Sequence, residues 1–121
     1  MDPLVIAETA ETPDVILDKG QGKFQITGKS LIENAGAFYK PVAEWLASYA
    51  KAPNPETNLS FKFEYLNIES SKSLLDLLTA LDKVKGAKVT WYFNEEDEDM
   101  EEIGEELAEL VNIPFEFKIH S

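Results

Sequence analysis

The hydrophobic period of the chain changes near its middle, and this change limits the folds that the chain can adopt. From Asn58 to Leu66, apolar side chains alternate with polar ones, which is the two-residue period of a β-strand. From Leu74 to Val84, leucines recur at spacings of three and four, which is the period of an amphipathic helix. The stretch therefore predicts a strand, a tight corner and a helix in succession.

The corner between this strand and this helix is polar. Four of its residues have side-chain oxygens that can accept the first free N–H groups of a helix: Asn67, Glu69, Ser70 and Ser71. Such a corner places hydroxyl groups beside the positive end of a helix dipole, where an anion or a phosphoryl group is favoured. Lys72 falls in the first helical turn, where a cation opposes the dipole. Its side chain either points into water at small cost or faces a carboxylate or phosphate of a partner.

The composition predicts one globular domain over residues 1–121. Of the 121 residues, 44% are hydrophobic, which is enough for a single packed core. The absence of cysteine excludes disulfides, thiol catalysis and thiolate metal sites. The single histidine, His120, rules out a His-rich metal site and argues against a histidine-based catalytic triad. We therefore expect no cofactor, no metal site of these kinds, and neither thiol nor histidine-triad catalysis.

The charge of the chain favours protein partners. The net charge is −12, and all eleven basic residues are lysines. An acidic surface repels the phosphates of nucleic acids and of anionic membranes, so we expect neither as a partner. The absence of arginine removes the guanidinium clamp of arginine-finger phosphoryl-transfer enzymes. With no signal peptide and no apolar run near 20 residues, we expect a cytoplasmic protein without membrane insertion.

Periods and breakers along the chain predict the order β-β-α-β-α-β-α-β. Residues 1–12 are interpreted as a flexible arm whose end can dock on the domain. The elements that follow are strands around 15–17, 23–28, 58–66, 88–93 and 115–119, and helices around 38–49, 74–84 and 100–111. Helices between successive strands imply right-handed crossovers. We therefore expect an α/β fold with a mixed, mostly parallel sheet of four to five strands and helices mainly on one face.

Four segments of the chain are similar to those of one known family. They are Ile26 to Ser30 with Glu33 to Ala35, Phe38 to Leu46, Tyr65 to Asn67 with Ser70 to Asp76, and Trp91 through the acidic run to Phe117. On these residues the sequence resembles the SiaC family of regulatory phosphoproteins. The fold of that family is like the sulfate-transporter and anti-anti-sigma-factor (STAS) domain. The similar segments extend over nearly the whole chain.

The resemblance implies a non-enzymatic switch in bacterial signalling and biofilm regulation. In such families a partner kinase phosphorylates a hydroxyl at the strand–helix corner, a phosphatase removes the phosphate, and only one form binds a downstream partner. In the best-known arrangement the downstream partner is a diguanylate cyclase, which the unmodified protein activates. A phosphate adds about −1.5 to −2 charge at pH 7, which can create or abolish an interface.

The corner departs from the family pattern. The usual corner is Asn-Thr-Ser-Ser with the threonine as acceptor, but this chain has Ile68 at the threonine position and Glu69 after it. Isoleucine cannot be phosphorylated, so Ser70 and Ser71 remain as candidate acceptors. Glu69 to Ser71 also resembles the Asp-Ser-Ser corner of anti-anti-sigma factors, in which the first serine is the acceptor. Two hypotheses therefore stay open: phosphorylation at Ser70, or a member held in one binding state. In both, the contact and control surface comprises Asn67, Ile68, Glu69, Ser70, Ser71 and Lys72.

The chain offers two alternatives to this reading. One is a small-ligand or anion-binding domain that uses the same helix N-terminus at the corner. The other is a hard-cation site in the acidic run from Glu95 to Glu102. That run lacks the ligand spacing of an EF-hand, so we favour a solvated loop whose acids suit the N-terminus of the next helix.

Several other side chains are assigned structural or surface roles. Trp45 and Trp91 fall on apolar stripes and are expected in the core, whereas Tyr92 alternates outward. Ser30 and Thr27, at an earlier strand–helix corner, are interpreted as caps. A homodimer through Tyr92 or an edge strand is compatible with the sequence, but no feature requires one.

Overall fold

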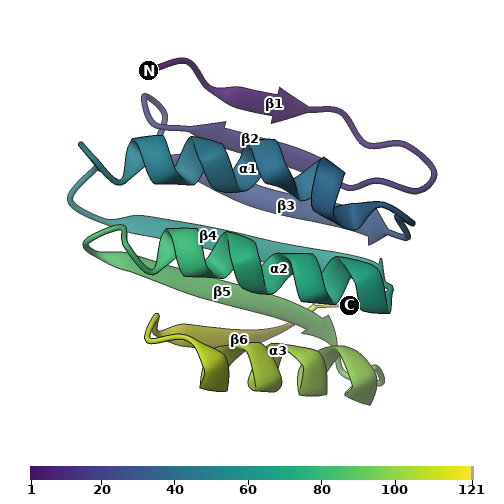
Figure 1. The fold of residues 1–121 in the computed structure, drawn as a ribbon. Coiled ribbons are helices and arrows are strands. Elements are labelled where there is room, and N and C mark those ends of the chain that lie inside the picture. Colours follow the sequence, from purple (N-terminus) through teal and green to yellow (C-terminus); the bar gives the residue numbers. More distant parts are fainter. Residues whose placement is uncertain (121) are drawn as a thin grey trace.

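A single six-stranded sheet with three helices makes up the computed structural model, which describes residues 1–120 (Figure 1). The strands are β1 (Leu4–Ile6), β2 (Asp14–Asp18), β3 (Lys23–Ser30), β4 (Thr57–Leu66), β5 (Ala87–Asn94) and β6 (Phe115–His120). The helices are α1 (Ala35–Tyr49), α2 (Ile68–Leu81) and α3 (Glu98–Leu110). Within residues 1–120, no helix has the length and apolar character that crossing a membrane requires.

The strands lie in the sheet in the same order as in the sequence. The pairs β1–β2 and β2–β3 are antiparallel, whereas β3–β4, β4–β5 and β5–β6 are parallel. Each helix connects two adjacent parallel strands, and successive right-handed crossovers in one direction place all helices on the same face of the sheet. Figure 1 shows α1, α2 and α3 together in front of the sheet. The predicted α/β class, with a mostly parallel sheet and helices on one face, is confirmed.

The predicted strand count of four to five is wrong by one strand, because the interpreted arm contains β1. Leu4 and Ile6 are partly buried against the core, and the indole N–H of Trp45 donates to the carbonyl of Asp2 at 2.8 Å. A strand of three residues is too short to show a hydrophobic period, so only its pairing with β2 reveals it. Trp45 is itself only half-buried, unlike the fully buried Trp91.

The core lies between the sheet and the helices. Every second residue of β4 from Leu59 to Phe63 is buried, and four leucines of α2 face them: Leu74, Leu77, Leu78 and Leu81. Gly104 of α3 lies against Trp91, where a Cβ would come within 2.6 Å of the indole ring, so α3 can approach the sheet only through a glycine. These contacts hold α2 and α3 against the sheet.

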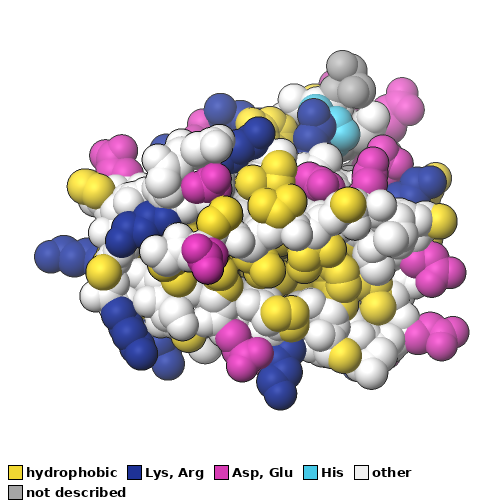
Figure 2. Space-filling view, turned by 90° about the horizontal axis from the view of Figure 1, so that it is seen from above, with side chains coloured by type: hydrophobic (Ala, Val, Ile, Leu, Met, Phe, Trp, Pro, Cys, Tyr) yellow, Lys and Arg dark blue, Asp and Glu magenta, His cyan; other side chains and the backbone are white. Residues whose placement is uncertain are grey.

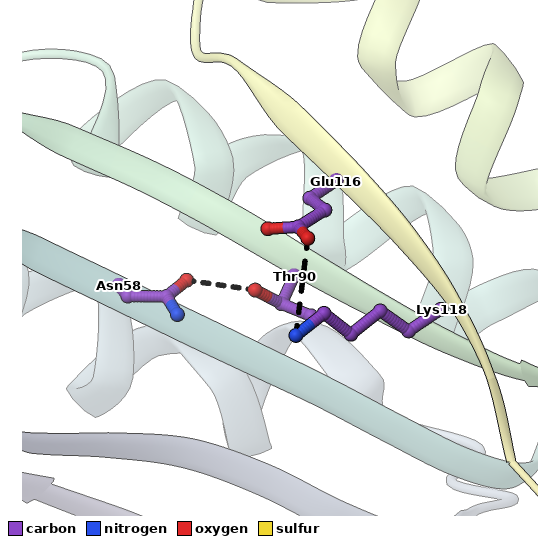
Figure 3. Close-up of polar contacts among 4 residues, drawn as sticks. All are labelled: Asn58, Thr90, Glu116 and Lys118. Atoms are coloured by element: carbon purple, nitrogen blue, oxygen red, sulfur yellow. Dashed lines mark hydrogen bonds and ion pairs between the residues drawn. The ribbon is translucent and has the colours of Figure 1, made fainter.

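The opposite face of the sheet is polar. Figure 3 shows Asn58, Thr90, Glu116 and Lys118 on three adjacent strands. The hydroxyl of Thr90 donates to the side-chain oxygen of Asn58 at 3.0 Å, and Lys118 lies 3.8 Å from Glu116. Both partners of this ion pair are about half exposed, so its contribution to stability is about 0–1 kcal/mol.

The side of the molecule at β1 carries a group of exposed hydrophobic side chains (Figure 2). Viewed from above Figure 1, hydrophobic side chains gather at the centre of this side, with charged side chains around them (Figure 2). The side chain of Val5 in β1 is 64% exposed. This edge lies on the far side of β2 and β3 from the strand–helix corner after β4, which makes Val5 a suitable control position for tests of that corner.

Candidate functional site: the corner between β4 and α2

The corner is a capped helix start that is bonded to the neighbouring strand. Asn67 is the N-cap of α2, and its side-chain oxygen accepts the backbone N–H of Ser70 at 2.8 Å. The backbone N–H of Asn67 donates to the carbonyl of Ser30 at 3.0 Å, and its side-chain amide donates to the carbonyl of Ile32 at 3.1 Å. Asn67 therefore shapes the corner, as the sequence predicts, and also fixes it to the end of β3.

Ser70 is fully buried and belongs to a cluster of three hydroxyl groups, the Ser30–Tyr39–Ser70 cluster. Ser70 donates to the carbonyl of Ser30 at 3.2 Å, and the hydroxyl of Ser30 donates to that of Ser70 at 2.7 Å. The hydroxyl of Tyr39 lies 2.6 Å from that of Ser30. Because the proton of Ser30 is directed to Ser70, Tyr39 must be the donor in the third bond. The cluster joins β3, α1 and α2 beneath the corner.

The phenol of Tyr39 stays protonated in this cluster. Burial raises the pKa of Tyr39 to about 12, although its hydrogen bond with Ser30 opposes the shift. The phenol is therefore a hydrogen-bond donor throughout the physiological pH range. The interpretation of Ser30 as a cap is wrong, because Asn34 is the N-cap of α1 and Ser30 is buried at the end of β3. Asn34 accepts the backbone N–H of Ala37 at 3.3 Å.

The spacing of apolar residues in α2 contains a signal for the burial of Ser70. Ser70 precedes Leu74 by four residues and Leu77 by seven, so it lies on the stripe that α2 turns toward the sheet. Its hydroxyl partner, Ser30, lies 40 positions earlier in the chain, and no local pattern predicts that contact.

The outer surface of the corner carries one apolar and two charged side chains. Ile68 is 71% exposed, and Glu69 and Lys72 are exposed as well. Ser71 is half-buried, and its hydroxyl donates to the carbonyl of Ile68 at 2.9 Å. Among residues 1–120, Lys72 forms no ion pair, which agrees with a side chain that points into water. Of the two candidate acceptors, only Ser71 therefore has a hydroxyl close to the surface.

Two further apolar side chains lie beside the corner, and the sequence did not identify them as site residues. Leu31 is 41% exposed and Tyr65 is 58% exposed, at the ends of the adjacent strands β3 and β4. The alternation of β4 predicts Tyr65 on the buried side with Phe63. However, the pairing with β3 skips Glu64, and this bulge turns Tyr65 outward. The ammonium group of Lys29 lies 5.9 Å from the centre of the Tyr65 ring.

The acidic run from Glu95 to Glu102 includes the N-cap and the first turn of α3. Asp97 is the N-cap and accepts the backbone N–H of Met100 at 3.0 Å, and the first helical turn is acidic. Within residues 1–120, no three acidic or histidine side chains are placed to hold a metal ion. A hollow of about 490 Å³ beside this run is lined by Glu64, Glu96 and Asp97, whose charges repel anions. This arrangement favours the solvated-loop reading and disfavours an anion site there.

The fold and the corner define a small α/β domain of the regulatory kind, in which a capped helix start is bonded firmly to the neighbouring strand. The chain belongs to the SiaC family: the model of that family, described as a regulatory phosphoprotein, matches residues 6–120. The predicted class of a regulatory protein, rather than an enzyme, is thereby confirmed.

Individual relatives agree with this assignment. An uncharacterised protein of Pseudomonas aeruginosa (strain UCBPP-PA14) is 26% identical over 124 residues, covering 99% of this chain and 98% of that protein. The crystal structure of apo-SiaC from Pseudomonas aeruginosa has the same fold, with a TM-score of 0.87, 24% identity, and coverage of 98% of this chain and 99% of that chain. The third relative is the structure of the diguanylate cyclase SiaD in complex with its activator SiaC from the same species. It matches with a TM-score of 0.86 at 26% identity and covers 97% of this chain and 99% of that chain.

Proposed function

We propose that this protein binds a diguanylate cyclase and regulates its activity, as a component of a signalling pathway that a kinase and a phosphatase control. The observation that carries the proposal is the likeness, over nearly the whole of both chains, to a structure in which SiaC is the activator of a cyclase. Membership of a family of regulatory phosphoproteins supports the control by phosphate. Residues 1–121 act as one regulatory domain in this proposal. We place it in the cytoplasm, where a kinase and a cyclase have their nucleotide substrates.

The proposed contact surface is the exposed part of the corner. Ile68 supplies an apolar contact, Glu69 and Lys72 supply charge, and Ser71 supplies a hydroxyl near the surface. Asn67 holds the backbone of the corner in place. The rigid capping supports this assignment, because a surface that is already ordered loses little conformational entropy on binding.

The proposal is tested by the rate at which a purified cyclase of the SiaD kind forms cyclic di-GMP. Adding this protein at increasing concentration is expected to raise the rate at least tenfold, with saturation at a fixed stoichiometry. The same titration with the Ile68→Asp variant, argued in the Discussion, shows whether the effect depends on the corner. A cyclase rate that stays unchanged at saturating protein, together with no binding by calorimetry, would contradict the proposal.

We assign the phosphate acceptor of this member to Ser71 and a structural role to Ser70. Ile68 has no hydroxyl, and a kinase would have to open the Ser30–Tyr39–Ser70 cluster to reach Ser70. After incubation with the partner kinase and ATP, phosphopeptide mass spectrometry is expected to find phosphate on Ser71. The Ser71→Ala variant should then remain unmodified, and an Ile68→Thr variant should gain a second acceptor. Phosphate on Ser70 in the wild-type protein would refute the assignment.

A further inference from the structure

A shallow apolar groove runs between α2 and α3, which lie side by side on the same face of the sheet (Figure 1). Leu75 contributes one wall, and Ile103, Leu107 and Leu110 contribute the other. Leu110 is 64% exposed although it is a leucine on a helix that packs against the core. Burying such a side chain completely against a partner would contribute about 1.5–3 kcal/mol to the binding free energy. The groove can therefore form a further apolar contact.

The groove continues to the corner. On α2, the groove is lined by Ser71, Lys72 and Leu75. The exposed Ile68 precedes Ser71 by one helical turn and Leu75 by two, so it lies on the same side of α2, just beyond the groove. Ile103 also lines a second hollow together with Tyr65. Exposed apolar side chains therefore occur from Tyr65 and Ile68 at one end to Leu110 at the other, and the acidic side chains of Glu64, Asp97 and Asp99 border the second hollow.

The dimensions of the groove fit a helix better than a small ligand. Its volume is about 190 Å³, below the roughly 300–1,000 Å³ of typical small-molecule sites. Ile103 and Leu110 are seven residues apart on α3, which corresponds to a rise of about 10 Å, or two helical turns. An amphipathic helix that lies in a groove offers apolar side chains at this spacing.

The negative charge of α3 favours a bound helix that has basic residues beside its apolar stripe. The helix contains seven acidic residues and no basic one: Glu98, Asp99, Glu101, Glu102, Glu105, Glu106 and Glu109. Glu106 lines the groove, and Glu102 and Glu109 follow it along the same side at helical spacing. A second copy of this chain, with its net charge of −12, would bring like charges to this rim. A partner with lysine or arginine beside its apolar stripe complements it.

We propose that the α2–α3 groove binds an amphipathic helix of a partner protein whose apolar stripe is flanked by lysine or arginine on the side that faces α3. The proposal deepens the proposed function and rests on it, because it names the element of the partner that this protein binds. The corner and the groove then form one continuous interface, in which a phosphate on Ser71 would lie at the groove wall.

The test uses two designed 18-residue helical peptides that share a leucine stripe and differ only in lysine or glutamate flanks. In NMR titrations of the whole protein, the lysine peptide is expected to shift the amide signals of Leu75, Ile103 and Leu110. The glutamate peptide should bind at least tenfold more weakly. The variant Leu110→Ser should weaken the lysine peptide tenfold or more, and its control Val5→Ser, also exposed by 64%, should not change the affinity.

The outcomes separate the groove from the proposed function. Lysine-peptide shifts confined to other surfaces, or equal affinity for wild type and Leu110→Ser, would overturn the groove proposal. If Leu110→Ser activates the cyclase as well as wild type does, the groove is not the cyclase interface although the proposed function holds. If the wild-type protein maps the lysine peptide to the groove but leaves the cyclase rate unchanged, the proposed function fails and the groove stands.

Discussion

Replacing Ser70 with aspartate is expected to lower the free energy of unfolding by about 3–5 kcal/mol, because the substitution buries an unpaired carboxylate. The side chain of Ser70 has no exposure to solvent. A carboxylate there could still accept the hydroxyl of Ser30, but it cannot donate to the carbonyl of Ser30, which would repel it, and it has no cation nearby to replace the lost water. Such a loss is a large part of the 5–15 kcal/mol that stabilises an ordinary domain. Urea unfolding at 25 °C, followed by circular dichroism, measures it.

The adjacent serine provides the matched control. The Ser71→Asp variant adds the same charge one residue later, where the side chain is only half-buried. There the carboxylate lies in the first turn of α2 and gains about 0.3–1 kcal/mol from the helix dipole, which offsets the lost bond to the carbonyl of Ile68. We expect a net change below about 0.5 kcal/mol. Equal stability of the two aspartate variants would show that Ser70 is accessible and would refute the role assigned to the cluster.

The different stabilities expected for the two aspartate variants determine which of them can serve to imitate a phosphate in binding experiments. An aspartate at position 70 imitates a phosphate only if the fold survives it, so a partner lost by that variant reports unfolding rather than regulation. A neutral substitution is milder: Ser70→Ala leaves the hydroxyl of Ser30 without its acceptor and should cost about 1–3 kcal/mol. Charge at the corner is therefore best varied at the surface, on Ile68, Glu69 or Ser71.

The fold was largely predictable from the sequence because its elements have clear hydrophobic periods. The alternation of β4 and the leucine stripe of α2 each specify an element, and helices between strands specify parallel pairing. Two local features were not predicted from the hydrophobic periods. The strand β1 has only three residues and takes its conformation from β2, and a bulge opposite Gly28 and Lys29 reverses the direction of Tyr65.

The candidate site was predictable in position but only partly in role. Asn67 has the side chain of an N-cap, and its capping bond was predicted correctly. The roles of Ser70 and Ser71 depend on which side of the helix faces the sheet and on hydroxyls from β3 and α1. Those contacts join residues far apart in the sequence, so residue type alone could not show that Ser70 is buried and Ser71 lies near the surface.

Replacing Ile68 with aspartate is expected to weaken binding to the cyclase strongly while leaving the fold intact. The side chain is 71% exposed, so the free energy of unfolding should change by less than about 0.5 kcal/mol. Within the proposed contact surface, the added carboxylate would be desolvated without a partner. The loss of a fully buried contact of this kind costs about 2–4 kcal/mol of binding free energy, which is roughly a 30- to 1,000-fold increase in Kd. Calorimetric titration of the purified cyclase measures this change.

The control is Val5→Asp, which places the same charge at a similarly exposed apolar position of β1, at the edge of the sheet. Its Kd for the cyclase should stay within twofold of wild type, and both variants should unfold at the wild-type urea concentration. A third variant, Ile68→Thr, restores the family's usual residue and should bind within about tenfold of wild type until it is phosphorylated. If Ile68→Asp binds as tightly as wild type, the corner does not contact the cyclase. If Val5→Asp weakens binding instead, the interface lies at the β1 edge.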